Sequence, residues 1–122
     1  MIRGIGTDIV ETDRISRAIK KDYFLKRAFT DSEIAMAKER NTDTFLAGNF
    51  AVKEAFVKAL GIGFRGIGLK DLEVLRDKYG KPFIRICNPE NIHLMDINEK
   101  NIYVSISNTN SLVVAMVVIE VD

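Results

Sequence analysis

The sequence predicts a mixed α+β protein, and three features support that class. Residues 42–60 contain no proline and a single glycine, and the glycine that follows at position 61 is typical of a helix end. Segments rich in β-branched residues open and close the chain at 2–10, 102–107 and 112–121. The length of 122 residues fits one compact domain, so we expect residues 1–122 to form a single unit.

The N-terminal third is expected to contain one strand and two short helices. Residues 2–10 are β-rich and interrupted by two glycines, which predicts a short first strand that ends near Asp8. Thr12 or Asp13 then caps a helix with apolar side chains on one face and basic ones on the other. Thr30-Asp31-Ser32-Glu33 fits a capping box, in which the threonine accepts from an early backbone N–H and the glutamate reaches back. It predicts a second helix that extends to about residue 40.

The helix expected at 42–60 is apolar nearly all round, so it should be central and buried. Its apolar residues are Phe45, Leu46, Phe50, Val52, Ala55, Phe56, Val57, Ala59 and Leu60. The stretch that follows matches G-x-G-x-x-G at 61–66. A dinucleotide-binding loop must follow a strand and open a helix, whereas this one follows a helix. We therefore interpret it as a helix stop and a pliable connection.

The C-terminal half is expected to consist mostly of strands. Residues 72–76 and 82–87 form two of them, joined by a hairpin turn. Asn88-Pro89 is typical of a helix start and predicts a short helix after the hairpin. The last two strands, 102–107 and 112–121, are joined by turn residues.

Composition and charge exclude several function classes. The formal net charge of +1 gives no long-range field, so we expect neither nucleic acid nor a membrane as a partner. The most apolar run, 112–119, is far shorter than the ~18 residues of a spanning helix. Cys87 is the only cysteine, which excludes an internal disulfide and a cysteine-based zinc site and favours a cytoplasmic protein with this thiol buried in a strand. With His93 as the only histidine, Ser–His or Cys–His nucleophilic catalysis is not expected.

Three charged residues lie within the most apolar part of the long helix, namely Lys53, Glu54 and Lys58. Glu54 and Lys58 are one turn apart on the same side. They form either an exposed Glu–Lys pair or a site in which the carboxylate binds Mg²⁺ and the lysines bind anionic oxygens. Burying charge is unfavourable unless the charge is paired or ligates something, which favours the second interpretation.

Asp8 stands where the first strand is expected to end, which is a usual place for a ligand residue as well as for a turn or cap residue. Mg²⁺ typically takes one or two protein carboxylates and completes its shell with water and substrate phosphate. Asp8 and Glu54 together meet that requirement. The residues alone therefore predict a magnesium–phosphate site of unknown substrate.

Four blocks resemble one family over essentially the whole chain. Gly4-Ile5-Gly6-Thr7-Asp8-Ile9-Val10-Glu11, followed by Arg14, resembles the opening of the holo-(acyl-carrier-protein) synthases, the small 4′-phosphopantetheinyl transferases. Phe45-Leu46-Ala47-Gly48 and the run from Phe50 through Lys53-Glu54-Ala55 to Gly61 look like the family's central helix. Gly80-Lys81-Pro82 and Val104-Ser105-Ile106-Ser107 match its other landmarks. The resemblance implies the family's fold, an antiparallel sheet packed around a long central helix.

The resemblance also implies a reaction. Such enzymes transfer the 4′-phosphopantetheine arm of coenzyme A to a serine of apo-acyl carrier protein, for fatty acid biosynthesis, and release adenosine 3′,5′-bisphosphate. By position, Asp8, Glu54 and Lys58 would be catalytic: the two carboxylates would bind Mg²⁺, and Lys58 would stabilise charge on the phosphates. The base that takes the serine proton stays open between Glu54, Asp8 and a metal-held water. The cofactor-binding positions implied are Lys53, Asn49, Gly80, Lys81, Pro82, Asn108 and Thr109.

Two kinds of partner follow from the resemblance. The family is known as a homotrimer with sites between subunits, which fits a short chain whose central helix is apolar nearly all round. Acyl carrier proteins are acidic, so Arg14, Arg17 and Lys21 would dock one by electrostatic attraction.

Two positions depart from the family pattern. Asn108 stands where a histidine that contacts the phosphate region of coenzyme A is usual, and Asn49 stands where an arginine is common. Both changes remove positive charge from the nucleotide end, which predicts weaker coenzyme A binding with the chemistry retained. They also motivate an alternative, a catalytically weak relative that binds coenzyme A or carrier protein without efficient turnover. A nucleic-acid module that uses the basic helix is a third hypothesis, which the near-neutral charge opposes.

Overall fold

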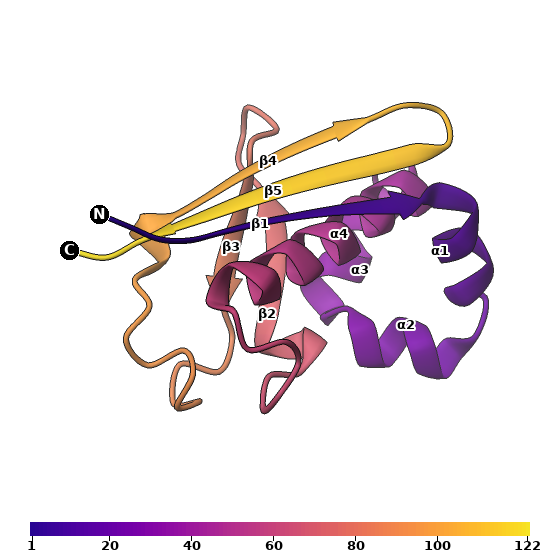
Figure 1. Cartoon of the computed structure of the whole chain (residues 1–122). Helices are drawn as coiled ribbons and strands as arrows, with labels where there is room; N and C mark the ends of the chain where they lie inside the picture. The colour runs from indigo at the N-terminus through magenta and orange to yellow at the C-terminus, as the bar shows by residue number, and fades with distance from the viewer.

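The protein is built around one long helix that packs against two antiparallel sheets (Figure 1). A computed structural model describes all residues from 1 to 122. In chain order the elements are β1 (Ile2–Glu11), α1 (Thr12–Ala18), α2 (Asp22–Ala28), α3 (Asp31–Lys38), α4 (Thr42–Leu60), η1 (Leu69–Asp71), β2 (Leu72–Arg76), β3 (Pro82–Ile86), η2 (Glu99–Asn101), β4 (Ile102–Asn108) and β5 (Leu112–Glu120). The expected α+β class with a long central helix is confirmed.

The larger sheet has the order β1-β5-β4, so the last strand of the chain lies in its middle. Both chain ends lie at one end of this sheet, and α1 and α2 lie at the other (Figure 1). The smaller sheet is the hairpin of β2 and β3. Because side chains alternate along a strand, one face of the larger sheet points at α4 and the other points away from the molecule.

Helix α4 begins and ends as its sequence predicts. The side chain of Asn41 accepts a hydrogen bond from the backbone N–H of Thr44, and Gly61 ends the helix in the left-handed conformation at φ 80°. Side chains on nearly every side of the helix are buried, and Ala47, Ala51 and Phe56 are fully buried. The helix therefore serves as the core of the molecule, and side chains from it reach several surfaces.

The two glycines of β1 allow this strand to lie directly against α4. A Cβ atom at Gly6 would clash with the carbonyl oxygen of Ala55, and one at Gly4 would clash with that of Ala59. The sequence pattern suggested that these glycines interrupt the strand and that it ends near Asp8. The strand instead runs through both glycines and past Asp8 to Glu11, because its pairing with β5 continues to Leu112. Their function is to remove side chains where a strand and a helix backbone meet.

Four expectations from the sequence are wrong in detail. Neither Thr12 nor Asp13 caps the first helix, because α1 already begins at Thr12, its N-cap is Glu11, and the buried Thr12 hydroxyl makes no hydrogen bond. The first helix ends at Ala18, and a separate helix, α2, begins at Asp22. The segment after Asn88 forms successive turns instead of a helix, because the side chain of Asn91 is tied to the carbonyl of Gly66. Cys87 is exposed, since the inward positions of β3 are Ile84 and Ile86 and the next outward position falls on the cysteine. The capping box of α3 is confirmed, and no helix is long and apolar enough to cross a membrane.

We predict that Gly6→Ala lowers the free energy of unfolding by about 3 kcal/mol, the upper end of the range for overpacking, because the added methyl group meets backbone atoms that cannot rotate away. Denaturant unfolding monitored by circular dichroism measures the change. Gly68→Ala is the matched control: its backbone φ is −92° and the nearest atom to the added Cβ lies 3.9 Å away. Equal stability of the two variants would contradict the proposed close packing of β1 on α4.

Candidate functional site

The fold brings two carboxylates from distant parts of the sequence to one cavity. Asp8 comes from β1, on the face that points at the helix, and Glu54 comes from α4. Both line a cavity of about 400 Å³ whose other walls include Phe24 and Phe50. The close packing of strand on helix at Gly4 and Gly6 makes this meeting possible, since a wider separation would hold the two side chains apart.

Lys58, one helical turn beyond Glu54, binds the same strand. Its ammonium donates to Asp8 Oδ1 at 3.1 Å and to the carbonyl of Thr7 at 3.0 Å. The lysine side chain is 56% exposed and that of Asp8 is 17% exposed, so the ammonium stays accessible to an anionic ligand. Asp8, Glu54 and Lys58 are the three residues that the resemblance implies for catalysis, and they lie side by side in the structure.

The electrostatics of the pair suit a cation. Burial, followed by the negative charge of Asp8, raises the pKa of the Glu54 carboxyl above its usual range, and Lys58 and Arg14 oppose this. No group of three or more histidine, cysteine, aspartate or glutamate side chains forms a metal cluster. Two neighbouring carboxylates fit Mg²⁺, which needs only one or two of them and takes its remaining oxygens from water and phosphate.

Basic and apolar groups surround this cavity. Arg14 lines it, and Arg17 and Lys21 are exposed nearby at the end of α1 and the start of α2. A neighbouring cavity of about 560 Å³ shares Phe24, Phe50 and Glu54 with the first and is otherwise lined mainly by the segment from 64 to 71. The carboxylates therefore stand between a basic surface and an apolar recess.

A second group of predicted residues gathers at a different pocket. Gly80, Pro82 and Asn108 line a pocket of about 220 Å³, together with Thr44, Phe45, Gly48, Arg76, Ile106 and Val113. These residues come from the β2–β3 turn, the end of β4 and the first turns of α4. Sequence reasoning found the three expected positions and missed Arg76, although an arginine just before a predicted turn was a visible signal.

Two further predicted residues serve the turns that shape this pocket. The backbone N–H of Lys81 donates to Asp77 Oδ1 at 3.0 Å, and its side chain is exposed. The hydroxyl of Thr109 accepts from the backbone N–H groups of Ser111 and Leu112 at 3.3 and 3.1 Å. Neither side chain lines the pocket.

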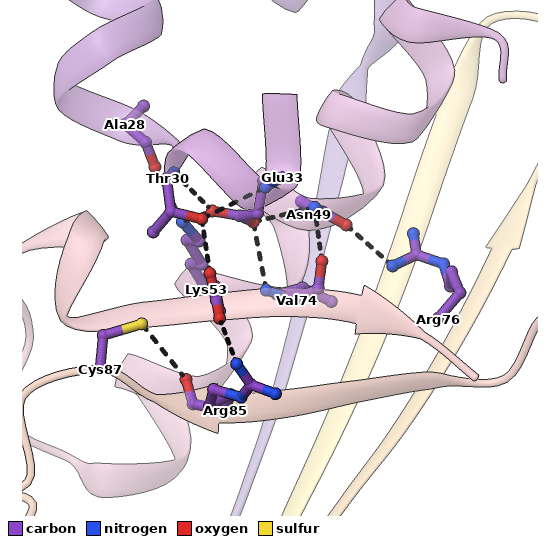
Figure 2. A network of polar contacts seen from close by, with 10 residues as sticks. Ala28, Thr30, Glu33, Asn49, Lys53, Val74, Arg76, Arg85 and Cys87 are labelled. Carbon is purple, nitrogen blue, oxygen red and sulfur yellow. Dashed lines mark hydrogen bonds and ion pairs between the residues drawn. The ribbon is translucent and has the colours of Figure 1, made fainter. Parts of the chain in front are cut away.

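Lys53 occupies a position that its predicted role does not explain. Its side chain is fully buried, and its ammonium donates to Glu33 Oε1 at 2.6 Å and to the carbonyl of Ala28 at 2.8 Å (Figure 2). Burial lowers the pKa of the Lys53 ammonium, and the attraction of Glu33 opposes that shift. The structure therefore does not support the expected contact between Lys53 and cofactor phosphates, because the ammonium is enclosed on the inner side of α4.

Asn49 is likewise fully buried. Its amide nitrogen donates to Glu33 Oε2 at 2.8 Å and to the carbonyl of Val74 at 2.9 Å, and its oxygen accepts from Arg76 Nη1 at 3.0 Å (Figure 2). These three bonds leave no exposed polar atom for a direct contact with a cofactor. Asn49 instead connects the buried ion pair to the arginine of the pocket.

The two pockets lie on different sides of α4. Phe45 and Glu54 are nine positions apart, which at 100° per residue places their side chains on opposite faces of the helix. No residue lines both the carboxylate cavity and the pocket of Gly80 and Asn108. A single copy of the chain therefore does not present both groups of residues to one small ligand.

Comparison with known proteins identifies the family. A family model described as the 4′-phosphopantetheinyl transferase superfamily matches residues 4–117. The chain belongs to this superfamily. The holo-(acyl-carrier-protein) synthase of Clostridium botulinum (strain Eklund 17B / Type B) is 51% identical over 124 residues, which cover 99% of this chain and 99% of the relative. The predicted family and enzyme class are thus confirmed, together with the reaction between coenzyme A and acyl carrier protein.

Solved structures agree with this membership. A holo-(acyl-carrier-protein) synthase from Bacillus anthracis str. Ames, in complex with CoA (3′,5′-ADP), has a TM-score of 0.83 at 35% identity, covering 100% of this chain and 99% of that one. The holo-(acyl-carrier-protein) synthase from Neisseria meningitidis has a TM-score of 0.85 at 34% identity, covering 98% and 99%. The predicted fold is confirmed along the whole chain.

We predict that Lys53→Met lowers the free energy of unfolding by about 3–5 kcal/mol, because it leaves the Glu33 carboxylate buried without its cation. Lys26→Met is the control: Lys26 forms a surface pair with Asp22, its side chain is 72% exposed, and its loss should change stability by less than about 1 kcal/mol. Urea unfolding of the two variants measures the difference. A Lys53→Met protein of normal stability with a raised KM for coenzyme A would instead restore the original expectation of a cofactor contact.

Proposed function

We propose that Asp8, Glu54 and Lys58 form the centre at which this transferase moves the phosphopantetheine arm from coenzyme A to a serine of acyl carrier protein. The observation that carries the proposal is the meeting of the two carboxylates and the lysine at one cavity, from β1 and α4. The named relatives act on acyl carrier protein, and some of their structures contain coenzyme A.

Asp8 and Glu54 would hold Mg²⁺, whose chemistry when bound is to neutralise charge on a pyrophosphate and on the phosphate that leaves. Lys58 is placed to donate to the same phosphate oxygens, since its ammonium is exposed beside Asp8. The serine oxygen forms a bond to the β-phosphorus of coenzyme A, and the bond from that phosphorus to the bridging oxygen breaks. Adenosine 3′,5′-bisphosphate leaves with the electron pair. Glu54, Asp8 or a bound water takes the serine proton.

The apolar recess beside Glu54 gives the arm a place to lie. It is lined by Phe24, Phe50, Phe64, Ile67 and Leu69, and it continues from the carboxylate cavity. The arm is attached to the reacting phosphate, so a recess that starts at Glu54 lies within its reach. Burial there would exclude water from the phosphate during transfer.

The complete site would lie between two copies of the chain, in a homotrimer. The outer face of the larger sheet is apolar and exposed, with Ile5, Ile9, Tyr103, Val114 and Met116 each at least 41% exposed. Such a patch is unusual on a monomer and is typical of an interface. A second copy seated there would supply its own pocket of Gly80 and Asn108 to the carboxylates of the first, which resolves their separation within one chain.

Acyl carrier protein would approach the carboxylates over the basic surface of Arg14, Arg17 and Lys21. All three side chains are exposed, and Arg14 reaches the cavity itself. Attraction between this surface and an acidic partner raises the association rate and weakens with salt. We also propose that the enzyme works in the cytoplasm and serves fatty acid biosynthesis, which its one free cysteine and its relatives' substrate support.

The second candidate, a weak relative that binds without turnover, rests on Asn49 and Asn108. It predicts that calorimetry detects coenzyme A or carrier protein binding while no arm is transferred. The active enzyme is favoured because Asp8 and Glu54 line one cavity and Lys58 donates a hydrogen bond to Asp8.

The transfer itself gives the first test. Incubation with apo-acyl carrier protein, coenzyme A and Mg²⁺ should add the mass of the arm to the carrier, as measured by intact-protein mass spectrometry. Glu54→Gln should reduce the rate by at least about 100-fold, because it removes a metal-ligand charge. The control Glu90→Gln changes an exposed carboxyl far along the sequence and should keep the wild-type rate. Absence of the added mass with the wild-type protein would contradict the proposal.

A second test addresses the assembly. Met116→Lys places a charge in the middle of the exposed sheet face and should convert the trimer to monomers without unfolding them. Light scattering coupled to gel filtration measures the mass, and the transfer rate should fall with it. Ile92→Lys is the control, since Ile92 is 78% exposed but lies in the loop after β3. A wild-type protein that is monomeric and active at assay concentration would refute the shared site.

A further inference from the structure

Arg76 has an unusual environment for a half-buried cation. Its guanidinium packs over the ring of Phe45, with Cζ 4.4 Å from the ring centroid. Nη1 makes both of its hydrogen bonds, to Asn49 Oδ1 at 3.0 Å and to the carbonyl of Leu75 at 3.3 Å. Nη2 and Nε donate to no protein atom. The side chain is thus fixed on one edge and free on the other.

The free edge faces the pocket of Gly80 and Asn108. Arg76 lines that pocket, and Gly48 beside it has no side chain to cover the guanidinium: a Cβ built there would lie 3.7 Å from Nη2. The other eight residues that line the pocket are apolar or uncharged, so none of them is a carboxylate. Asp77, the next residue, uses its carboxylate to accept from the backbone N–H groups of Tyr79 and Lys81.

The local charge also lacks compensation. Arg76 takes part in no ion pair, and Arg40 lies over the same aromatic ring, with its Cζ 5.8 Å from the centroid of Phe45. Burial, followed by the charge of Arg40, lowers the pKa of the Arg76 guanidinium to about 10, and the charge of Glu33 only partly opposes this. The arginine remains charged at neutral pH, so an anion that enters the pocket would supply the missing partner.

We propose that Arg76 binds the 3′-phosphate of coenzyme A, an assignment that rests on the transferase function proposed above. Coenzyme A carries two separate phosphate groups, a pyrophosphate and a 3′-phosphate on the ribose. The pyrophosphate reacts and belongs at Asp8 and Glu54. The phosphate that remains for the pocket of Arg76, on another face of α4, is the one on the ribose. A guanidinium with one edge fixed and the other free can donate two parallel hydrogen bonds to a phosphate.

The neighbours of Arg76 then have defined tasks. Phe45 supports the plane of the guanidinium, and Asn49 fixes its edge through an amide that the buried Glu33 in turn orients. Asn49 is a positioning residue in this arrangement, because it acts through Arg76 and has no exposed polar atom. The positive charge at this end of the site comes from β2.

The test compares ligands that differ only in the 3′-phosphate. Calorimetry with adenosine 3′,5′-bisphosphate and with AMP measures binding without turnover. Arg76→Gln should weaken binding of the bisphosphate by about 10- to 100-fold and that of AMP by less than about twofold, since one charged hydrogen-bond partner is removed from one phosphate. In the transfer assay, the same variant should raise KM for coenzyme A and change KM for 3′-dephospho-coenzyme A little.

Two variants provide controls. Lys78→Gln removes an exposed positive charge from the same hairpin turn, outside the pocket, and should bind both ligands as the wild-type protein does. Arg76→Lys keeps the charge but loses the planar fork, and a loss smaller than that of Arg76→Gln, still confined to the bisphosphate, is expected. If thermal unfolding shows that Arg76→Gln is not folded at the assay temperature, the comparison of the two ligands on Arg76→Lys decides.

Equal losses for the bisphosphate and AMP, or no loss for either, would overturn the assignment of Arg76. A wild-type protein that binds the two ligands equally would overturn it as well. Failure of the transferase proposal has a different signature: the wild-type protein would add no mass to the carrier, while its preference for the bisphosphate would persist and still depend on Arg76.

Discussion

The buried ion pair of Lys53 and Glu33 holds together the elements on which both halves of the site depend. The Glu33 carboxylate accepts from the Lys53 ammonium and the Asn49 amide of α4, from the backbone N–H of Val74 on β2, and from the backbone N–H of Thr30. Its two oxygens therefore connect α3, α4 and the smaller sheet within one network. A fully satisfied buried network is rigid and specifies one arrangement, whereas a partly satisfied one is strongly unfavourable.

This network connects the buried ion pair to the pocket of Gly80 and Asn108. The amide nitrogen of Asn49 donates to Glu33 and to the carbonyl of Val74, and its oxygen accepts from Arg76. The sequence comparison with the family pattern suggested that Asn49 leaves the nucleotide end short of positive charge. In the structure the guanidinium of Arg76, from β2, lies beside Asn49, and under the assignment proposed above it would supply that charge from a different element. Asn108 lines that pocket as an uncharged group.

Local patterns were sufficient to predict most of the fold, because caps and periodicity determine element type. The helix at 42–60 and the capping box at Thr30 are examples, and the resemblance located Asp8, Glu54 and Lys58 correctly relative to one another. The interior polar contacts were not predictable in this way. Lys53 and Glu33 are twenty residues apart, and nothing in either neighbourhood indicates the other. Arg76 was missed although it stands just before a predicted turn, because its environment comes from Phe45, Gly48 and Asn49, which lie on another element.

The glycines of β1 have a consequence for the reaction chemistry. Glycine-rich segments before an acidic residue are usually interpreted as flexible loops, yet Gly4 and Gly6 lie within a paired strand and neither has a positive φ. They allow the strand and helix backbones to approach closely, and this close approach brings the Asp8 and Glu54 carboxylates to one cavity. Main-chain contact would then limit how far apart the two carboxylates can lie, and with it the size of a cation that both could bind.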